Sequence, residues 1–192
     1  MEPPEERPSR KARRAADATW RRLERRQRDL LQRQIARRRC SECTVCCTVK
    51  GIGELQKPAG QHCPHMAPEG TSCLIYGRHP RSCRGYYCAW RKGFLGADER
   101  PDLIGVLFEH GRTVLVPGVR VIVAREAHDG ALDAVQELLG ALARKWIVIK
   151  VRGDERSALG PPEVMATVTE KLKGTSHIQV DDGSMGTEAR KR

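Results

Sequence analysis

The sequence predicts an α+β fold: a basic N-terminal helix, an irregular metal-stapled cysteine-rich lobe, and a small ββαβ sheet-and-helix unit packed with that lobe. Three observations predict it. All eight cysteines of the 192 residues lie between Cys40 and Cys88, in a stretch that glycine and proline interrupt repeatedly. The stretch before Cys40 is rich in arginine. The stretch after Gly96 combines β-branched runs with one run of helical periodicity.

Residues 1–39 form a predicted basic arm, partly disordered and partly helical. The first ten residues are rich in Pro, Glu and Arg and are expected to be disordered. From about Ala15 to Arg39 the arm contains no Gly or Pro, which favours a helix. Apolar side chains recur along it at helical intervals and predict a narrow apolar stripe: Trp20, Leu23, Leu30 or Leu31, and Ile35.

The charge of the arm predicts an acidic partner. Residues 1–39 contain fourteen Lys or Arg and six Asp or Glu, which gives a net charge of +8 out of the chain's +11. Arginine-rich helices neutralise phosphates with little sequence preference, so weak binding of nucleic acid or of an acidic protein is expected. Trp20 is the only aromatic residue of the arm, which argues against base stacking. The competing interpretation is that the stripe packs on the rest of the chain or on a second copy.

Residues 40–96 form the predicted cysteine lobe. Its many glycines and prolines predict loops and short turns, a backbone that needs cross-links to keep its shape. The N-terminus lacks an apolar signal region, and no run approaches the about eighteen apolar residues of a membrane span. A cytoplasmic location without membrane contact is therefore expected. There, clustered thiols stay reduced and bind metal more often than they form disulfides.

All eight cysteines are candidate metal ligands. Two residues between cysteines let a tight turn direct both sulfurs to one centre. Adjacent side chains diverge, so Cys46 and Cys47 are expected to serve two centres, or to divide into one ligand and one small buried residue. The pattern begins C-x2-C-x2-C-C and continues at wider intervals through Cys40, Cys43, Cys46, Cys47, Cys63, Cys73, Cys83 and Cys88.

Two cofactors fit these ligands, an iron–sulfur cluster of the 4Fe-4S kind or Zn²⁺. Zinc takes four thiolates in a tetrahedron. Bacterial ferredoxins combine C-x2-C-x2-C with a remote cysteine before proline, which Cys63-Pro64 supplies here at a different interval. His62 and His65 flank Cys63, and a mixed Cys/His set would favour zinc. The residues leave the metal, the number of centres and the role of the histidines open.

The segments "CSECTVCC" and "CLIYGRHPRSCRGYYCAW" resemble the YkgJ-like cysteine-cluster family, described as zinc- or iron-chelating. The resemblance covers about residues 40–90. It departs at His79, where the family has arginine, which leaves open whether His79 is an extra ligand. The matching positions are the eight cysteines together with Ile75, Tyr76, Pro80, Arg84 and Tyr86.

The resemblance implies metal binding and assigns no reaction. We therefore expect a metal-binding protein whose cluster is structural or redox-responsive. Some relatives resemble flagellin lysine methylases, which implies the alternative of an iron–sulfur-dependent methyltransferase-like enzyme. Its site would lie at an open metal position near Tyr76, His79 and Arg84. Whether the chain is an enzyme stays open, and no catalytic residue is assigned.

Residues 97–173 form the predicted small α/β unit, followed by a disordered tail over residues 174–192. "LIGVLFEHG" and "TVLVPGVRVIVARE" predict two strands separated by a turn around Gly111. "DGALDAVQELLGALAR" predicts one helix with Asp129 as its N-cap. "WIVIKVR" predicts a strand buried on both faces, and residues 162–172 a last helix. The helix between the strands should bury Leu132, Val135, Leu138, Leu139 and Leu142.

Overall fold

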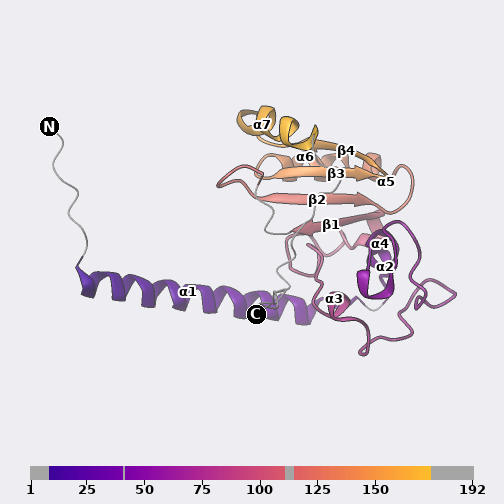
Figure 1. Ribbon diagram of the computed structural model, residues 1–192, viewed down its shortest axis with the longest axis horizontal. Coiled ribbons are helices and arrows are strands. Elements are labelled where there is room, and N and C mark those ends of the chain that lie inside the picture. Colours follow the sequence, from indigo (N-terminus) through magenta and orange to yellow (C-terminus); the bar gives the residue numbers. More distant parts are fainter. Residues whose placement is uncertain (1–8, 41, 111–114, 174–192) are drawn as a thin grey trace, which may run out of the picture.

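A computed structural model of the chain describes residues 9–40, 42–110 and 115–173. Within them the fold is mixed α/β with a long N-terminal helix, which confirms the predicted class (Figure 1). The predictions for residues 1–8, for the turn around Gly111 and for the tail lie outside the described residues. The elements are α1 (Arg10–Arg37), α2 (Val45–Val49), η1 (Gly53–Leu55), α3 (Arg81–Arg84), α4 (Pro101–Ile104), β1 (Val106–His110), β2 (Val121–Glu126), α5 (Ala131–Ala134), α6 (Gln136–Ala143), β3 (Ile147–Arg152), β4 (Glu155–Leu159) and α7 (Pro162–Lys173).

The four strands form one sheet in the order β1-β2-β3-β4. β1 and β2 are antiparallel, with Phe108 opposite Ala124, and β2 and β3 are parallel, with Val123 opposite Ile149. The helices α5 and α6 connect β2 to β3, as a parallel pair requires. The predicted ββαβ order is thus confirmed. The sequence analysis missed β4, which pairs antiparallel with β3 at the edge of the sheet.

Three predicted element boundaries are wrong. The strand expected from Leu103 begins only at Val106, because α4 ends at Ile104 and Gly105 turns the chain with φ 66°. Residues 115–120 are not strand, since Pro117 and Gly118 interrupt them. The single helix expected after β2 is two, α5 and α6, which meet at a non-helical Val135.

The start of α5 also differs from the prediction. Its N-cap is Gly130, whose left-handed φ of 80° ends the preceding turn, and not Asp129. A backbone N–H in the first turn of α5 is satisfied by a side chain of the preceding strand β2: the Leu132 N–H donates to Glu126 Oε1 at 3.1 Å. The apolar face itself is as expected. Leu132 and Leu139 are buried, and Val135, Leu138 and Leu142 pack against the same core.

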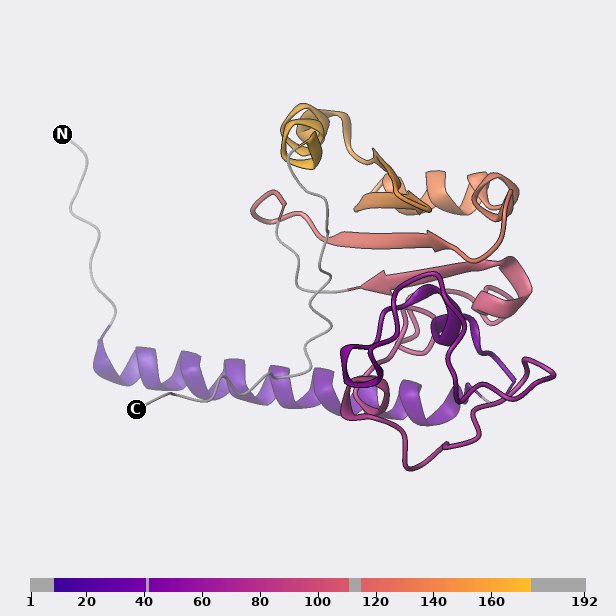
Figure 2. The ribbon, with the colours of Figure 1, turned by 45° about the vertical axis from the view of Figure 1, so that its right-hand side comes forward.

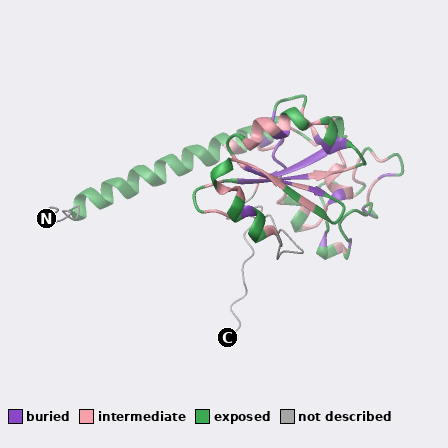
Figure 3. Cartoon of the chain, turned by 90° about the horizontal axis from the view of Figure 1, so that it is seen from above, coloured by how far each residue is buried: buried purple, intermediate pink, exposed green. Residues whose placement is uncertain are grey.

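Apolar residues pack on both faces of the sheet, whose strands are largely buried (purple in Figure 3). On one face Ile122 and Val148 pack with Leu139 of α6 and with Trp90 of the cysteine lobe. On the other, Val123 and Ile149 are in a second cluster with Val168 of α7. The strand β3 contributes to both clusters, so its predicted burial on two faces is confirmed. Because the first cluster includes residues of the lobe and of the sheet, the two regions share one core.

The helix α1 projects from this body and packs against it only at its C-terminal end (Figures 1 and 3). Ile35 is buried, whereas Trp20 is 64% and Leu30 is 53% exposed. Arg38 Nη1 fixes the end of the helix by donating to the carbonyl oxygen of Leu95 at 2.8 Å. Most of the predicted apolar stripe therefore faces solvent. None of the helices in the described ranges combines the length and apolar composition needed to cross a bilayer.

Candidate metal centre

All eight cysteines line one cavity of about 410 Å³. The loops of this region lie beside the end of α1 and the β1 edge of the sheet (Figure 2). Cys46 and Cys47 lie on α2, and Cys83 lies on α3. The others come from the loops that connect these short elements. None of the eight forms a disulfide. Chain folding thus brings together every sulfur that the spacing selected as a ligand.

The cysteine side chains line the same cavity, but their sulfur atoms are not arranged around a common point as metal ligands would be. In the described part of the chain, no three His, Cys, Asp or Glu side chains are arranged as a metal-binding group. Four thiolates must each come to about 2.3 Å from a shared Zn²⁺. Side-chain rotation within the cavity is therefore required for binding. The donor chemistry itself fits, because thiolates are the ligands that zinc and iron–sulfur clusters select.

The adjacent cysteines of α2 lie in different surroundings. Successive side chains on a helix point about 100° apart. Cys46 packs against the main core cluster, which contains the buried Cys88. Cys47 interacts electrostatically with the ammonium group of Lys57, which also interacts with Cys46. The two thiols are hydrogen-bonded to each other, so the assignment of Cys46 and Cys47 to two centres stays a prediction.

Proton affinities differ sharply between these thiols. The Cys46 thiol donates a hydrogen bond to Cys47 sulfur, and this bond lowers the pKa of Cys47 to about 7, assisted by Lys57 and opposed by burial. The same bond, followed by burial, raises the pKa of Cys46 well above its usual value. Burial also raises the pKa of Cys43, to about 12. Metal binding at Cys43 must therefore displace a firmly held proton, so affinity depends on pH.

Lys57 is a buried cation that interacts electrostatically with several of the cysteines, and the sequence analysis did not single it out. Only 5% of the residue is exposed. Its Nζ donates to the carbonyl oxygens of Thr48 at 3.0 Å and Pro58 at 3.1 Å, and to that of Lys50. Burial lowers its pKa, while the thiolates of Cys63 and Cys47 act in the opposite direction. Its fixed charge can compensate negative sulfur.

Arg91 supplies a second cation on the other side of the cysteine set. Its Nη1 lies 3.7 Å from Cys40 Sγ. Its Nε donates to the Arg38 carbonyl oxygen at 2.7 Å and its Nη2 to that of Ile35 at 3.0 Å, so the guanidinium is held in place. Lys50 also lines the cavity, and its ammonium group pairs with the buried carboxylate of Glu109 at 2.8 Å.

The candidate histidines divide between the cavity and the surface. His65 and His79 line the cavity, together with Tyr76 and Arg84. His79 Nδ1 accepts from the Gly77 N–H at 3.1 Å, and burial followed by the charge of Arg84 lowers its pKa. A neutral imidazole is the form that binds metal. His62 does not line the cavity, and its Nδ1 lies 3.3 Å from the Thr48 hydroxyl.

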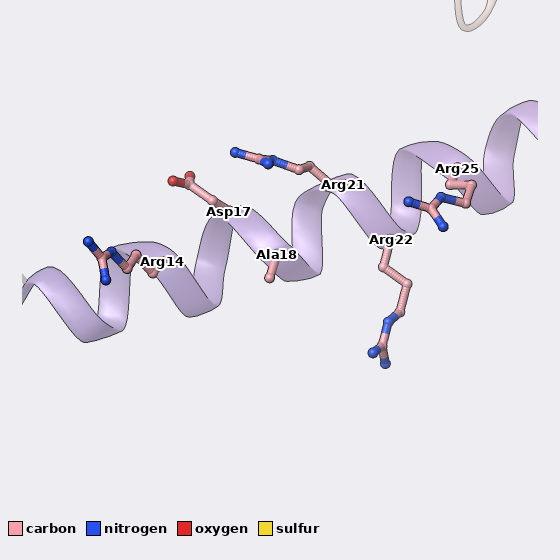
Figure 4. A pocket seen from close by; sticks show the side chains of 6 residues that line it. All are labelled: Arg14, Asp17, Ala18, Arg21, Arg22 and Arg25. Carbon is pink, nitrogen blue, oxygen red and sulfur yellow. The ribbon is translucent and has the colours of Figure 1, made fainter.

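The basic arm has a charged hollow of its own, away from the cysteines. Ala18 leaves a gap between long side chains on α1, with Arg21 and Arg22 projecting to opposite sides of the helix (Figure 4). Asp17 extends on the side of Arg21. Among the residues that the structure describes, those lining this hollow all belong to α1. The helix carries eleven Lys or Arg against three Asp or Glu over Arg10–Arg37.

Comparison with known proteins adds no relative. No family model matches the chain, and neither the curated proteins nor the solved structures compared with it give a match. The resemblance of residues 40–90 to the YkgJ-like family therefore stays a prediction. The functional argument rests on the residues and on the cavity they line.

Proposed function

We propose that the chain is a metal-binding protein whose clustered cysteines hold an iron–sulfur cluster or Zn²⁺ in a structural or redox-responsive role. One observation carries the proposal. The eight cysteines lie in residues 40–88, a segment of loops and short helices. All eight line a single cavity, and none forms a disulfide. Thiols gathered at this density without cross-links are typical of a metal site.

The weak apolar core of the lobe supports the proposal. Over residues 50–87, all of which are described, the buried residues are Ile52, Lys57, Cys63 and Ala67. One of these is a lysine and one is a candidate ligand. So little apolar burial does not offset the conformational entropy of ordering the segment. A metal bound by cysteines spread over the same segment would supply the missing stabilisation.

The bound group would supply positive charge at the centre of the cavity and, for an iron–sulfur cluster, a reversible one-electron couple. The chain's own residues provide the ligands and offset their charge. Four thiolates around Zn²⁺ leave a net charge of −2, which is costly to bury. Lys57 and Arg91 each bring one positive charge to the cysteines. Loss of thiolate by oxidation would release the metal, which suits a redox-responsive role.

Anaerobic purification of the full chain, followed by elemental analysis and a visible spectrum, tests the proposal. We expect either iron with acid-labile sulfide and a broad visible absorption, or colourless protein with stoichiometric zinc. Cys43→Ser and Cys83→Ser should lower the bound metal, while the control His62→Ala, outside the cavity, should leave it unchanged. A reduced, folded chain that takes up neither zinc nor iron would overturn the proposal.

A second candidate function is weak binding of nucleic acid or of an acidic protein through residues 1–39. The exposure of α1 and its excess of arginine favour it. Replacing Arg21, Arg22, Arg25 and Arg26 by Gln tests it. In fluorescence anisotropy with a generic DNA duplex, the variant should bind more weakly. Its slope of log K against log[salt] should become shallower by up to about 3.6, at about 0.9 per lost phosphate contact. Equal slopes for the variant and the wild type would refute binding through the arm.

A further inference from the structure

We infer that the cavity accommodates two separate four-thiolate centres, the first formed by Cys40, Cys43, Cys46 and Cys88 and the second by Cys47, Cys63, Cys73 and Cys83. The inference rests on the proposed function, and it assigns the eight proposed cysteine ligands to two centres of four. Spacing alone leaves this division open, because C-x2-C-x2-C-C permits several assignments of its adjacent pair.

The division begins on α2. Thr44 precedes this helix, and the Cys47 N–H donates to the Thr44 carbonyl oxygen at 2.7 Å, so both cysteines are held in its first turns. Their side chains leave the helix about 100° apart. Cys46 packs against the core cluster that contains Cys88, and Cys47 interacts electrostatically with Lys57, while the two thiols keep a hydrogen bond to each other. One short helix therefore supplies a ligand to each side of the cavity.

The first set is held together where the end of α1 meets the loop between α3 and α4. The Cys43 N–H donates to the Cys40 carbonyl oxygen at 2.6 Å, which closes a tight turn. Arg91, three residues after Cys88, reaches Cys40 Sγ at 3.7 Å and anchors the two segments to each other. Cys46 interacts electrostatically with Cys40 and Cys43, and Cys88 interacts with Cys40.

The second set is held together by the loops between η1 and α3. An isolated antiparallel bridge pairs Met66 with Cys73, and the Leu74 N–H donates to the His65 carbonyl oxygen at 2.9 Å. This bridge brings Cys73 beside the turn of Cys63, whose carbonyl oxygen accepts from the Met66 N–H at 3.0 Å.

The helix α3 joins this set through Glu54 of η1. The Glu54 carboxylate accepts from the backbone N–H groups of Arg81 at 3.1 Å and Ser82 at 3.0 Å, which fixes the start of α3 and hence Cys83. Cys83 in turn interacts electrostatically with the sulfurs of Cys47, Cys63 and Cys73. All four members of the second set are thus linked.

Each set has its own fixed cation. Arg91 lies at the first set, and Lys57 interacts with Cys63, Cys47 and Cys83 of the second, and also with Cys46. The link between the sets is the adjacent pair Cys46 and Cys47 itself. The two sets share one cavity of about 410 Å³, which all eight cysteines line. On loading, each centre takes up its metal as the thiols release their protons to solvent.

Metal stoichiometry measured on full-length protein tests this division. Reduced protein is reconstituted with Co²⁺ alone, and bound cobalt per chain and the thiolate-to-cobalt absorption are measured after desalting. The wild type should bind two ions. Cys43→Ser and Cys73→Ser should each bind half as much as the wild type. The double variants within one set, C40S/C43S and C63S/C73S, should also retain half. The double variant across the sets, C43S/C73S, should bind none.

The outcomes separate this inference from the proposed function. One ion per wild-type chain would overturn the division and leave metal binding intact, whereas no bound ion would overturn both. A within-set double variant that binds less than its parent single variant would show that the sets are drawn wrongly. Because misfolding of the cross-set variant would also abolish binding, the half-occupancy of the single variants, checked by their circular dichroism, decides the result.

Discussion

Replacing Lys57 by Met should destabilise the cysteine lobe more than any exposed lysine change. Lys57 is 5% exposed, and its ammonium donates to three carbonyl oxygens. Methionine keeps most of the volume and leaves these acceptors without a donor. Hydrogen bonds from a charged group contribute about 1.5–3 kcal/mol each. The variant also recovers the several kcal/mol that burial of an ammonium costs.

The net expected loss is about 3 kcal/mol in the free energy of unfolding. With a urea slope of about 2 kcal/mol/M, the unfolding midpoint should fall by about 1.5 M. The control Lys145→Met changes an exposed lysine and should leave the midpoint within about 0.3 M. Metal content should fall as well, because the Cys47, Cys63 and Cys83 thiolates lose their nearest fixed cation. A Lys57→Met protein with the wild-type midpoint and full metal content would refute the role given to this residue.

Two further predictions concern titrating groups. In reduced, metal-free protein at pH 7, iodoacetamide should modify Cys47 well before Cys43, because their pKa values are about 7 and about 12; peptide mass spectrometry measures the order. Burial, with Lys92 and Arg120 nearby, lowers the pKa of His110 from 6.5 to about 4. The folded state thus favours neutral His110, so its contribution is complete above pH 6.5 and is lost as pH falls towards 4. Urea titrations should show about 1–3 kcal/mol lost over this window in the wild type and less in His110→Phe.

The sequence predicted the elements that bury a continuous apolar pattern and missed those that depend on tertiary pairing. β3 was found because its apolar run is covered on both faces. β4 was missed because Glu155–Leu159 is a largely polar edge strand without an apolar pattern of its own. It is a strand because its backbone pairs with β3. The helix α4 was missed although Pro101 at its start and Gly105 after its end are the usual boundary residues.

Gly105 shows how tightly that boundary is fixed. Its φ of 66° lies in the left-handed region, and an added Cβ would lie 2.3 Å from His128 Nε2 and 2.8 Å from Ala131 Cβ. The close approach of α4 to the start of α5 therefore requires glycine. Such a contact joins segments more than twenty residues apart, and periodicity within one segment carries no information about it.

The candidate site divides in the same way. Spacing identified all eight cysteines as one group, because short intervals between thiols are typical of ligands that converge on one site, and all eight line one cavity. It did not identify Lys57, since nothing in "ELQKPAG" distinguishes this lysine from a solvated one. The burial of Lys57 arises from the bridge between Ile52 and Lys57 itself and from the carbonyl oxygens around Nζ. Side-chain environments of this kind come from folding and not from residue order.

The uneven distribution of the core predicts that metal removal opens the cysteine loops while the sheet persists. Ala89 and Trp90 are anchored to the sheet, with the Ala89 N–H donating to the Phe108 carbonyl oxygen at 2.7 Å. In residues 50–87, by contrast, the buried residues are Ile52, Lys57, Cys63 and Ala67, although Tyr86 packs partly against the main core; under the proposed function this segment relies on the bound metal. Local stability should therefore differ between the two regions once the metal is removed.

Limited trypsin digestion with and without a chelator measures this difference. Cleavage after the exposed Arg78 should accelerate at least tenfold when the metal is removed, while the segment from β1 to α7 stays resistant at Arg152. A tenfold change corresponds to about 1.4 kcal/mol in the opening equilibrium of the loop. Equal acceleration at both sites would mean that the chain unfolds as one unit, and unchanged cleavage at Arg78 would mean that the loop does not depend on the metal. Faster cleavage at Arg78 alone is the result that a redox-responsive role requires. In that role, loss of the metal exposes the cysteine loops while the rest of the protein stays folded.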